Sequence, residues 1–346
     1  MFGISSTFVN SYYNYIYSML TPIFGAPLSI YISLIFSLLL FFIILFLIIG
    51  IFGYTFGWLE RKIIAKAQSR HGPTYVGKYG FLQNFADLIK LISKEHILPS
   101  SADTPLFQLS LIGIVTAFIF MLVFIPLSQG FVGIDTSYAV LIVFFILSLA
   151  PLIEFIIGWS SGNKFSSISA QRSIIMLVSY EIPLLIVVAS IIMLAGSYNF
   201  QAIVNTQSNI WFVFIAPIGF IIFFIALLAE LERPPFDLRE ADNELIAGHL
   251  TDVSAPYYAL MLLLDYTRML VGSLLLVIFF FGGWLGPIII PAFLWLMIKV
   301  AIVAVFIIII RATTVRMRID KLLRIGWKYL MPLAVINFII IFTFFI

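Results

Sequence analysis

The chain begins with a long uncharged stretch, since no acidic or basic side chain occurs between Met1 and Leu59. Over all 346 residues, 62% are hydrophobic and only 10% are charged. Soluble domains carry about 25% charged residues, so lipid rather than water must surround most of this chain. A helix needs roughly 20 apolar residues to span a bilayer. The composition therefore excludes a water-soluble enzyme and allows many membrane spans joined by modest loops.

Apolar runs of spanning length recur along the chain without alternating in polarity, which predicts helices rather than barrel strands. We therefore expect an all-α, polytopic membrane protein with a bundle of about eight transmembrane helices. The helices are expected at residues 29–58, 105–128, 138–158, 170–196, 210–230, 253–282, 287–310 and 326–346. Residues 29–346 would form one transmembrane domain, and residues 1–28 would form an N-terminal extension at the membrane interface.

The basic residues gather in alternate loops of this arrangement. Of the 19 Lys and Arg residues, 17 lie in the odd-numbered loops, and the even-numbered loops contain none. Since Lys and Arg are enriched in cytoplasmic or matrix loops, we expect the odd-numbered loops, here called the inner loops, on that face. Both termini would then lie on the opposite face. The start of the chain resembles neither a secretory signal nor a transit peptide, and we expect neither.

The sequence contains no Cys, which excludes iron–sulfur clusters held by thiolates and Cys-based zinc sites. Its three His residues offer little for haem ligation. We therefore expect no metal site in this chain, and any redox chemistry that it serves would be housed in partner proteins.

The first inner loop, residues 60–104, is too long to be a simple turn. Its start, residues 60–66, is typical of a short basic amphipathic helix at the interface. Farther on, a second amphipathic helix is predicted by apolar residues at helical spacing, namely Leu82, Phe85, Leu88, Ile89 and Ile92. Two interpretations stay open: surface helices anchored by Lys and Arg at headgroups, or a portal where an amphiphilic molecule passes between lipid and protein.

The third inner loop differs from the others in sign, since it holds seven carboxylates and two Arg residues between Glu230 and Asp252. Its Arg-Pro-Pro-Phe-Asp-Leu segment is stiff, because two prolines restrict the backbone. Phe236 and Leu238 favour burial. We therefore expect a packed acidic loop that serves in docking or proton handling, and we assign no role to His249.

Several ionisable residues lie within the predicted spans, where each charge costs about 2.5–3.5 kcal/mol and usually faces protein or water. Asp265 and Arg268 are three residues apart and could pair on one helix face. Glu181 has no partner within its own helix, and Glu230 and Asp265 could join it in a hydrophilic path between helices. The positions are Glu154, Glu181, Glu230, Asp265, Arg268 and Lys299.

Four segments of the chain follow one known pattern in order. They are Glu60–Lys62 with Arg70–Gly80, Gly158–Ser161 with Ser179–Glu181, Ala229–Gly248, and Arg311–Lys328. Together they resemble the NADH:ubiquinone oxidoreductase chain 1 family, the quinone-site membrane subunit of respiratory complex I. Two carboxylates lie outside that pattern, because Glu232 stands where the family is usually neutral and Glu154 matches no family motif. Three others, Asp242, Asp252 and Asp265, stand where the family usually has glutamate.

The resemblance implies a core membrane subunit of a proton-pumping NADH:ubiquinone oxidoreductase, an enzyme only as part of its complex. Such a subunit binds no cofactor and has no catalytic residue of its own; its substrate is ubiquinone. Flavin and iron–sulfur clusters lie in partner subunits of the hydrophilic arm, and other partners are membrane-arm subunits and lipids, with no nucleic acid.

The resemblance also implies roles for individual residues. The quinone channel and its entrance would involve Glu60, Arg61, Phe85, Arg233, Phe236 and Asp237. The proton path would involve Tyr180, Glu181, Glu230, Glu240, Glu244 and Asp265. Lys299 matches a family lysine.

Two other functions stay open, a membrane subunit of a related hydrogenase-type complex and a stand-alone secondary transporter. Transporters usually carry internal repeats, and no repeat links the two halves of this chain. The resemblance implies the mitochondrial inner membrane, with both termini on the intermembrane-space side; a bacterial plasma membrane is the second location.

Overall fold

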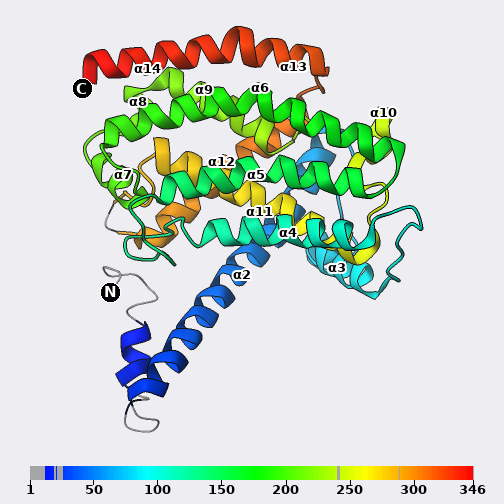
Figure 1. Ribbon diagram of the computed structural model, residues 1–346, viewed down its shortest axis with the longest axis horizontal. Helices are drawn as coiled ribbons and strands as arrows, with labels where there is room; N and C mark the ends of the chain where they lie inside the picture. The colour runs from blue at the N-terminus through cyan, green and yellow to red at the C-terminus, as the bar shows by residue number, and fades with distance from the viewer. Residues whose placement is uncertain (1–11, 19–20, 22–25, 240–241, 288, 346) are drawn as a thin grey trace.

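The computed structural model describes residues 12–18, 21, 26–239, 242–287 and 289–345, and every regular element within them is a helix (Figure 1). Seven helices are long and apolar enough to span a membrane. These are α2 (Ala26–Ala67), α4 (Thr104–Leu122), α5 (Ala139–Ser160), α6 (Lys164–Ala195), α11 (Ala255–Phe280), α12 (Ala292–Thr313), and α13 with α14 (Ile319–Ile325 and Met331–Phe345). The eighth apolar helix, α9 (Pro217–Glu230), is shorter. The predicted polytopic all-α bundle is confirmed.

Helix α11 is the central helix of the bundle. Its side chains are buried on every side from Thr267 to Phe280, as expected for a helix that is apolar all round. Three rings surround Phe279 at centroid distances of 5.7–5.9 Å, those of Phe144, Phe200 and Phe223. The surrounding helices α2, α4 and α12 pack directly against α11.

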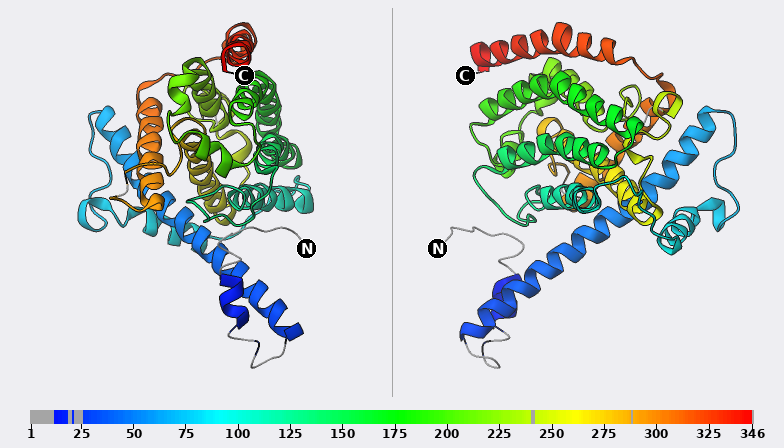
Figure 2. Two further views of the ribbon diagram at one scale, coloured as in Figure 1. Left: turned by 90° about the vertical axis from the view of Figure 1, so that its left-hand side faces the viewer. Right: turned by 45° about the vertical axis from the view of Figure 1, so that its right-hand side comes forward.

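Helix α2 runs obliquely along the edge of the bundle and projects beyond it (Figure 2). Only 22% of its most hydrophobic stretch is buried. The separate amphipathic helix that we predict at residues 60–66 is wrong, because α2 continues unbroken to Ala67. The physical reason is packing: Glu60 points into the protein and Ala65 is fully buried, so this stretch belongs to the bundle rather than to the interface.

The second amphipathic helix of the first inner loop is confirmed as α3 (Gln83–Ser93). It packs against α2 and α11, while Phe85, Leu88, Ile89 and Ile92 keep large exposed fractions. Hydrogen bonds tie its N-terminal end to α2: Tyr54 donates to the Phe81 carbonyl at 2.7 Å, and the Asn84 amide donates to the Tyr54 carbonyl at 2.9 Å.

The fifth predicted span, residues 210–230, is broken into α8 (Phe212–Ile215) and α9. Pro217 disfavours the helical conformation at Ala216 and then starts the next helix. The 14 residues of α9 give a length of about 21 Å, which is less than the roughly 30 Å of hydrocarbon in a bilayer. The helix ends at Glu230.

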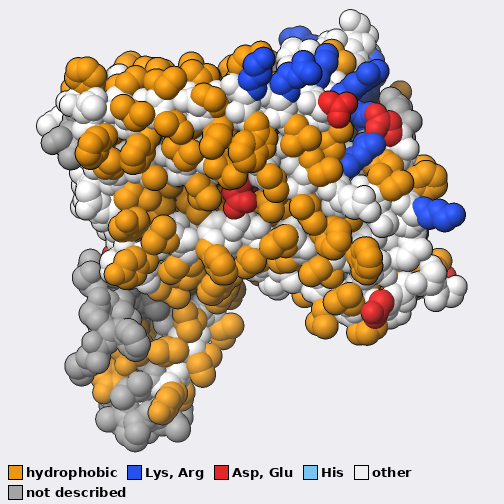
Figure 3. Space-filling model, turned by 45° about the horizontal axis from the view of Figure 1, so that its top comes forward, with side chains coloured by type: hydrophobic (Ala, Val, Ile, Leu, Met, Phe, Trp, Pro, Cys, Tyr) orange, Lys and Arg blue, Asp and Glu red, His pale blue; other side chains and the backbone are white. Residues whose placement is uncertain are grey.

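The remaining helices are short, and they lie in loops. They are α7 (Phe200–Thr206) and α10 (Asp242–Leu245), with 3₁₀ turns at Lys78–Gly80 and Gly248–Leu250. A π-helical turn, Gly326–Leu330, joins α13 to α14. Charged side chains gather at the end of the molecule where α10 and α13 lie, whereas hydrophobic side chains cover most of the rest of the visible face (Figure 3). Of the predicted N-terminal extension, residues 12–18 are helical and most others lie outside the described residues.

Candidate functional site

An apolar cavity of about 210 Å³ lies between α2, α3 and α11. Small residues on α2 leave room for it, and Gly53 allows the Tyr266 side chain of α11 to approach within van der Waals distance. The half-exposed side chains of Phe85 and Leu88 lie at its α3 side. The cavity is lined mainly by apolar groups, including Ile49, Gly53, Phe85, Leu88, Leu263 and Tyr266.

A second, polar cavity of about 380 Å³ adjoins the first, and we call it the charged chamber. Arg61, Leu262 and Tyr266 line both cavities, so they form the boundary between them. The charged chamber is lined by Glu60, Arg61, Arg233, Asp265, Tyr266 and Arg311, among others. An apolar cavity and a charged cavity thus lie side by side.

Glu60 is the central carboxylate of the charged chamber. It is 4% exposed and accepts a hydrogen bond of 2.7 Å from Arg233 of the third inner loop. Arg311, at the end of α12, forms a second ion pair with Glu60, and Tyr266 donates a hydrogen bond to it. Two guanidinium groups thus share one carboxylate. Because positive charge exceeds negative charge among these three groups, this end of the chamber can stabilise negative charge on a bound molecule.

The boundary residue Arg61 is held from the α3 side. Its guanidinium pairs with Asp87 at 2.6 Å, and Gln83 donates a second hydrogen bond to Asp87 at 3.1 Å. Burial raises the pKa of Asp87, but the hydrogen bonds from Arg61 and Gln83 outweigh it, and the net pKa lies below its usual value. Asp87 therefore stays ionised at neutral pH and fixes Arg61 between the two cavities.

Three of the predicted proton-path residues come together inside the bundle. Tyr180 of α6 donates a hydrogen bond to Glu230 at the end of α9, and both side chains are buried. Glu181 lies within electrostatic range of Glu230 and accepts a hydrogen bond from Ser148 of α5. A fourth predicted residue, Asp265, lines the charged chamber.

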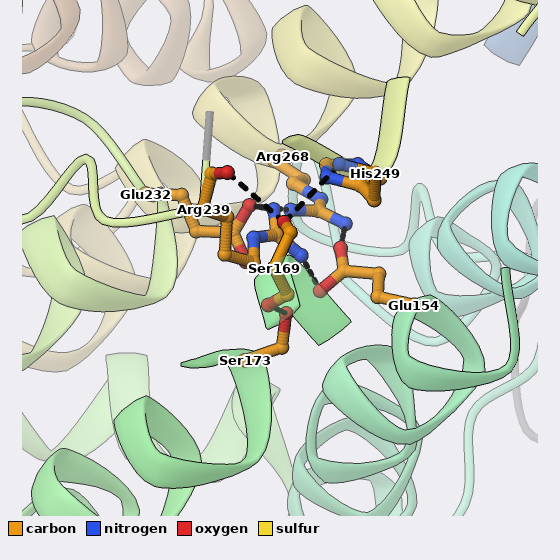
Figure 4. Close-up of polar contacts among 7 residues, drawn as sticks. All are labelled: Glu154, Ser169, Ser173, Glu232, Arg239, His249 and Arg268. Atoms are coloured by element: carbon orange, nitrogen blue, oxygen red, sulfur yellow. Dashed lines mark hydrogen bonds and ion pairs between the residues drawn. The ribbon is translucent and has the colours of Figure 1, made fainter. Parts of the chain in front are cut away.

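Arg268 forms ion pairs with Glu154 of α5 and Glu232 of the third inner loop. Arg239 pairs with the same two carboxylates (Figure 4). From the sequence we considered a pair between Arg268 and Asp265 on the same helix. The ion-pair partners that the structure shows for Arg268 lie instead on α5 and in the third inner loop. The two carboxylates outside the family pattern, Glu154 and Glu232, thus share their partners.

The third inner loop is packed, as its sequence predicts. Phe236 and Leu238 are buried. Phe236 lines a small cavity together with Tyr180 of α6 and Gly326, which lies between α13 and α14. Asp237 is partly buried, while Glu240 lies outside the described residues.

Glu244 lies at the surface of this loop, where Arg172 and Arg316 pair with it at 2.7 and 2.5 Å. The hydrogen bond from Arg172 lowers the pKa of Glu244. This residue therefore remains ionised at neutral pH and ties the loop to α6.

Lys299 of α12 binds the chain directly after the C-terminal end of α11. Its ammonium donates to the carbonyls of Phe281, Gly283 and Leu285 at 2.7–3.0 Å and lies 4.7 Å from the Trp211 ring. A cation at the C-terminal end of a helix also complements the helix dipole. Lys299 therefore joins α11 to α12.

Three residues beside Glu60 and Arg61 are missed by the sequence analysis: Tyr266 and Arg311 of the charged chamber, and Asp87 of the apolar cavity. Only the fold brings Tyr266 and Arg311 to Glu60, and Asp87 to Arg61. Among the residues that the structure describes, no group of three His, Cys, Asp or Glu side chains could hold a metal ion.

Comparison with known proteins identifies the family of this chain. A family model described as NADH dehydrogenase matches residues 38–342. An NADH-quinone oxidoreductase subunit from Dehalococcoides mccartyi strain CBDB1 is 40% identical over 82% of this chain and 80% of its own length. The corresponding NADH-quinone oxidoreductase subunits from Carboxydothermus hydrogenoformans and a Geobacillus species are 38% and 40% identical, over 81% and 86% of their own lengths. The chain therefore belongs to the NADH dehydrogenase family.

Proposed function

We propose that this chain is a core membrane subunit of a proton-pumping NADH:quinone oxidoreductase and that its two adjoining cavities admit the quinone. The observation that carries the proposal is the apolar cavity beside α3 that adjoins the charged chamber around Glu60. A quinone joins an apolar isoprenoid tail to a polar ring, and the two cavities match these two parts in order. This pairing of an apolar with a charged cavity favours a quinone enzyme over the hydrogenase-type complex and the transporter.

The charged chamber suits quinone reduction electrostatically. Negative charge develops on the ring oxygens during reduction, and the guanidinium groups of Arg233 and Arg311 lie beside a single carboxylate. Such interactions are far stronger in a water-poor site than in bulk water. The electrons would come from flavin and iron–sulfur centres in partner subunits, because this chain has no Cys to hold a cluster.

Proton coupling would use the buried carboxylates near the third inner loop. Glu230, beside Tyr180, and Arg233, beside Glu60, are only three residues apart in the chain. A change of charge in the chamber would therefore act on the same short segment that positions the proton-path carboxylate. Glu181 and Asp265 would extend the path, and Glu240 and Glu244 would belong to its loop end.

The arrangement in the membrane follows from the charges. The inner loops would face the cytoplasm or matrix and dock the hydrophilic arm, with both termini on the other side. The mitochondrial inner membrane remains a prediction, and a bacterial plasma membrane is the alternative that fits the bacterial relatives.

A pair of matched variants on α3 tests the quinone cavity. Leu88 lines it, whereas its neighbour Ile89 is similarly exposed but does not. Leu88→Trp fills the cavity and should lower inhibitor-sensitive NADH:quinone reductase activity in membranes about tenfold, at an unchanged content of assembled complex. Ile89→Trp should retain near-normal activity. Equal effects of the two variants would contradict the assigned cavity.

A further inference from the structure

Four charged side chains, three of them buried and one nearly so, form a closed ring at the inner end of the bundle. Glu154 comes from α5, Arg268 from α11, and Glu232 and Arg239 from the third inner loop. Each Arg forms ion pairs with both Glu side chains, and the Arg268–Glu232 pair measures 2.8 Å (Figure 4). Two charges of a loop thus alternate with two charges of the transmembrane helices.

The ring is deeply buried. The side chains of Glu154, Arg239 and Arg268 are 2–5% exposed, and that of Glu232 is 12% exposed. Charges removed from water are tolerated only when partners compensate them. Here each charge has two neighbours of opposite sign and the formal charges cancel. Removing any one member leaves an uncompensated charge inside the protein.

Backbone contacts hold the same loop against α6. The Ser169 hydroxyl donates to the Arg239 carbonyl at 2.9 Å and accepts from the His249 backbone N–H at 3.1 Å. Gly248 lies so close to the Arg239 carbonyl that a side chain there would collide with it. Both ends of the loop segment 239–249 are therefore fixed at one point on α6.

The ring also fixes a turn that connects two parts of the proposed mechanism. Glu232 has φ 54°, a left-handed conformation that residues other than glycine seldom adopt. It lies between Glu230, whose carboxyl meets Tyr180, and Arg233, which pairs with Glu60. Contacts of the Glu232 side chain with two arginines hold this turn in place.

We propose that the ring is a positioning device that locks the third inner loop, residues 231–252, onto α5 and α11. In doing so it holds Arg233 in the charged chamber and Glu230 beside Tyr180. The four side chains are positioning residues, since they act through Arg233 and Glu230. The proposal rests on the proposed function for its quinone readout, whereas the locking of the loop can be measured without it.

The double variant E154Q/R268Q tests the lock in the assembled complex. It removes one negative and one positive neighbour, so the buried charge stays balanced and only the Glu232–Arg239 pair remains. Amide hydrogen exchange over residues 231–239 and 242–252 should become about tenfold faster. The KM for quinone should rise about three- to tenfold. The matched control D320N/K321Q removes an exposed pair in α13 and should change neither quantity.

A further pair of variants separates a ring from independent ion pairs. Exchanging two charges as E154R/R268E would preserve an isolated pair, but within a ring it places Arg beside Arg239 and Glu beside Glu232. We therefore expect this exchange to release the loop at least as much as E154Q/R268Q. If E154Q/R268Q does not assemble, R268K carries the test. Lysine lacks the fork that reaches two carboxylates, so faster exchange and a higher KM are again expected.

Unchanged exchange over the loop in an assembled ring variant would overturn the lock, whatever the enzyme activity. A loss of assembled complex with a normal KM and normal exchange in the remainder would also overturn it, since that result describes support of the fold alone. Failure of the proposed function is distinguishable, because a wild-type complex that binds no quinone at this chain could still show the exchange difference.

Discussion

At the scale of single residues, the chain places its polar chemistry in pairs of groups that satisfy one another. Two guanidinium groups share the Glu60 carboxylate, and Glu230 accepts a hydrogen bond from the hydroxyl of Tyr180. Such pairing is needed because a buried polar group without a partner costs about 1–3 kcal/mol. Each function therefore depends on individual atoms, and substitutions that remove one atom can test it.

Tyr180→Phe removes only the hydroxyl that Glu230 accepts. The variant should pump fewer protons per electron, because Glu230 loses its hydrogen-bond partner, while the quinone KM stays normal, because Tyr180 does not line the chamber. Proton translocation and electron transfer are measured together in inverted vesicles. Tyr198→Phe, an exposed tyrosine outside α6, is the matched control. Normal coupling in Tyr180→Phe would remove this tyrosine from the proposed path.

At the scale of elements, the third inner loop is held by contacts to several helices. It carries Arg233 toward the chamber, Glu232 and Arg239 into the buried ring, and His249 onto α6. Burial and the neighbouring Arg239 lower the pKa of His249 well below its usual value. The imidazole is therefore neutral in the packed loop and gains a proton more easily when the loop unfolds.

The lowered pKa of His249 predicts how stability depends on pH. Its contribution is fully present above the unfolded pKa of about 6.5 and is lost as the pH falls toward the lower folded value. The wild-type complex should therefore lose thermal stability between pH 7.5 and pH about 5.5, and His249→Gln should lose less of it. Half-lives of activity at both pH values measure this. Parallel losses in both proteins would show that His249 does not contribute.

Much of the fold could be predicted from element-scale patterns in the sequence. Apolar runs predict the eight helices because lipid demands continuous apolar surface, and the stripe on α3 follows from its period. The break at Ala216 and the continuation of α2 to Ala67 depend on one proline and on inward packing, which hydropathy does not report. The ring joins Glu154 and Arg268 across 114 positions, a pairing that no local pattern encodes.

At the scale of the whole molecule, the inner end concentrates the proposed chemistry around one segment of chain. Residues 230–239 contribute to the charged chamber, to the Tyr180 contact and to the buried ring. The central helix α11 contributes Tyr266 to both cavities and Arg268 to the ring. Quinone binding and proton handling would thus share a common rigid support.

The most direct test of the account is to locate the quinone on this chain. A photoreactive quinone analogue is added to the intact complex in native membranes, and the labelled peptides are identified by mass spectrometry. We expect labels on α3 and on the facing part of α11, residues 259–266, which an excess of natural quinone suppresses. Labels confined to other subunits, or to surfaces of this chain away from both cavities, would contradict the account.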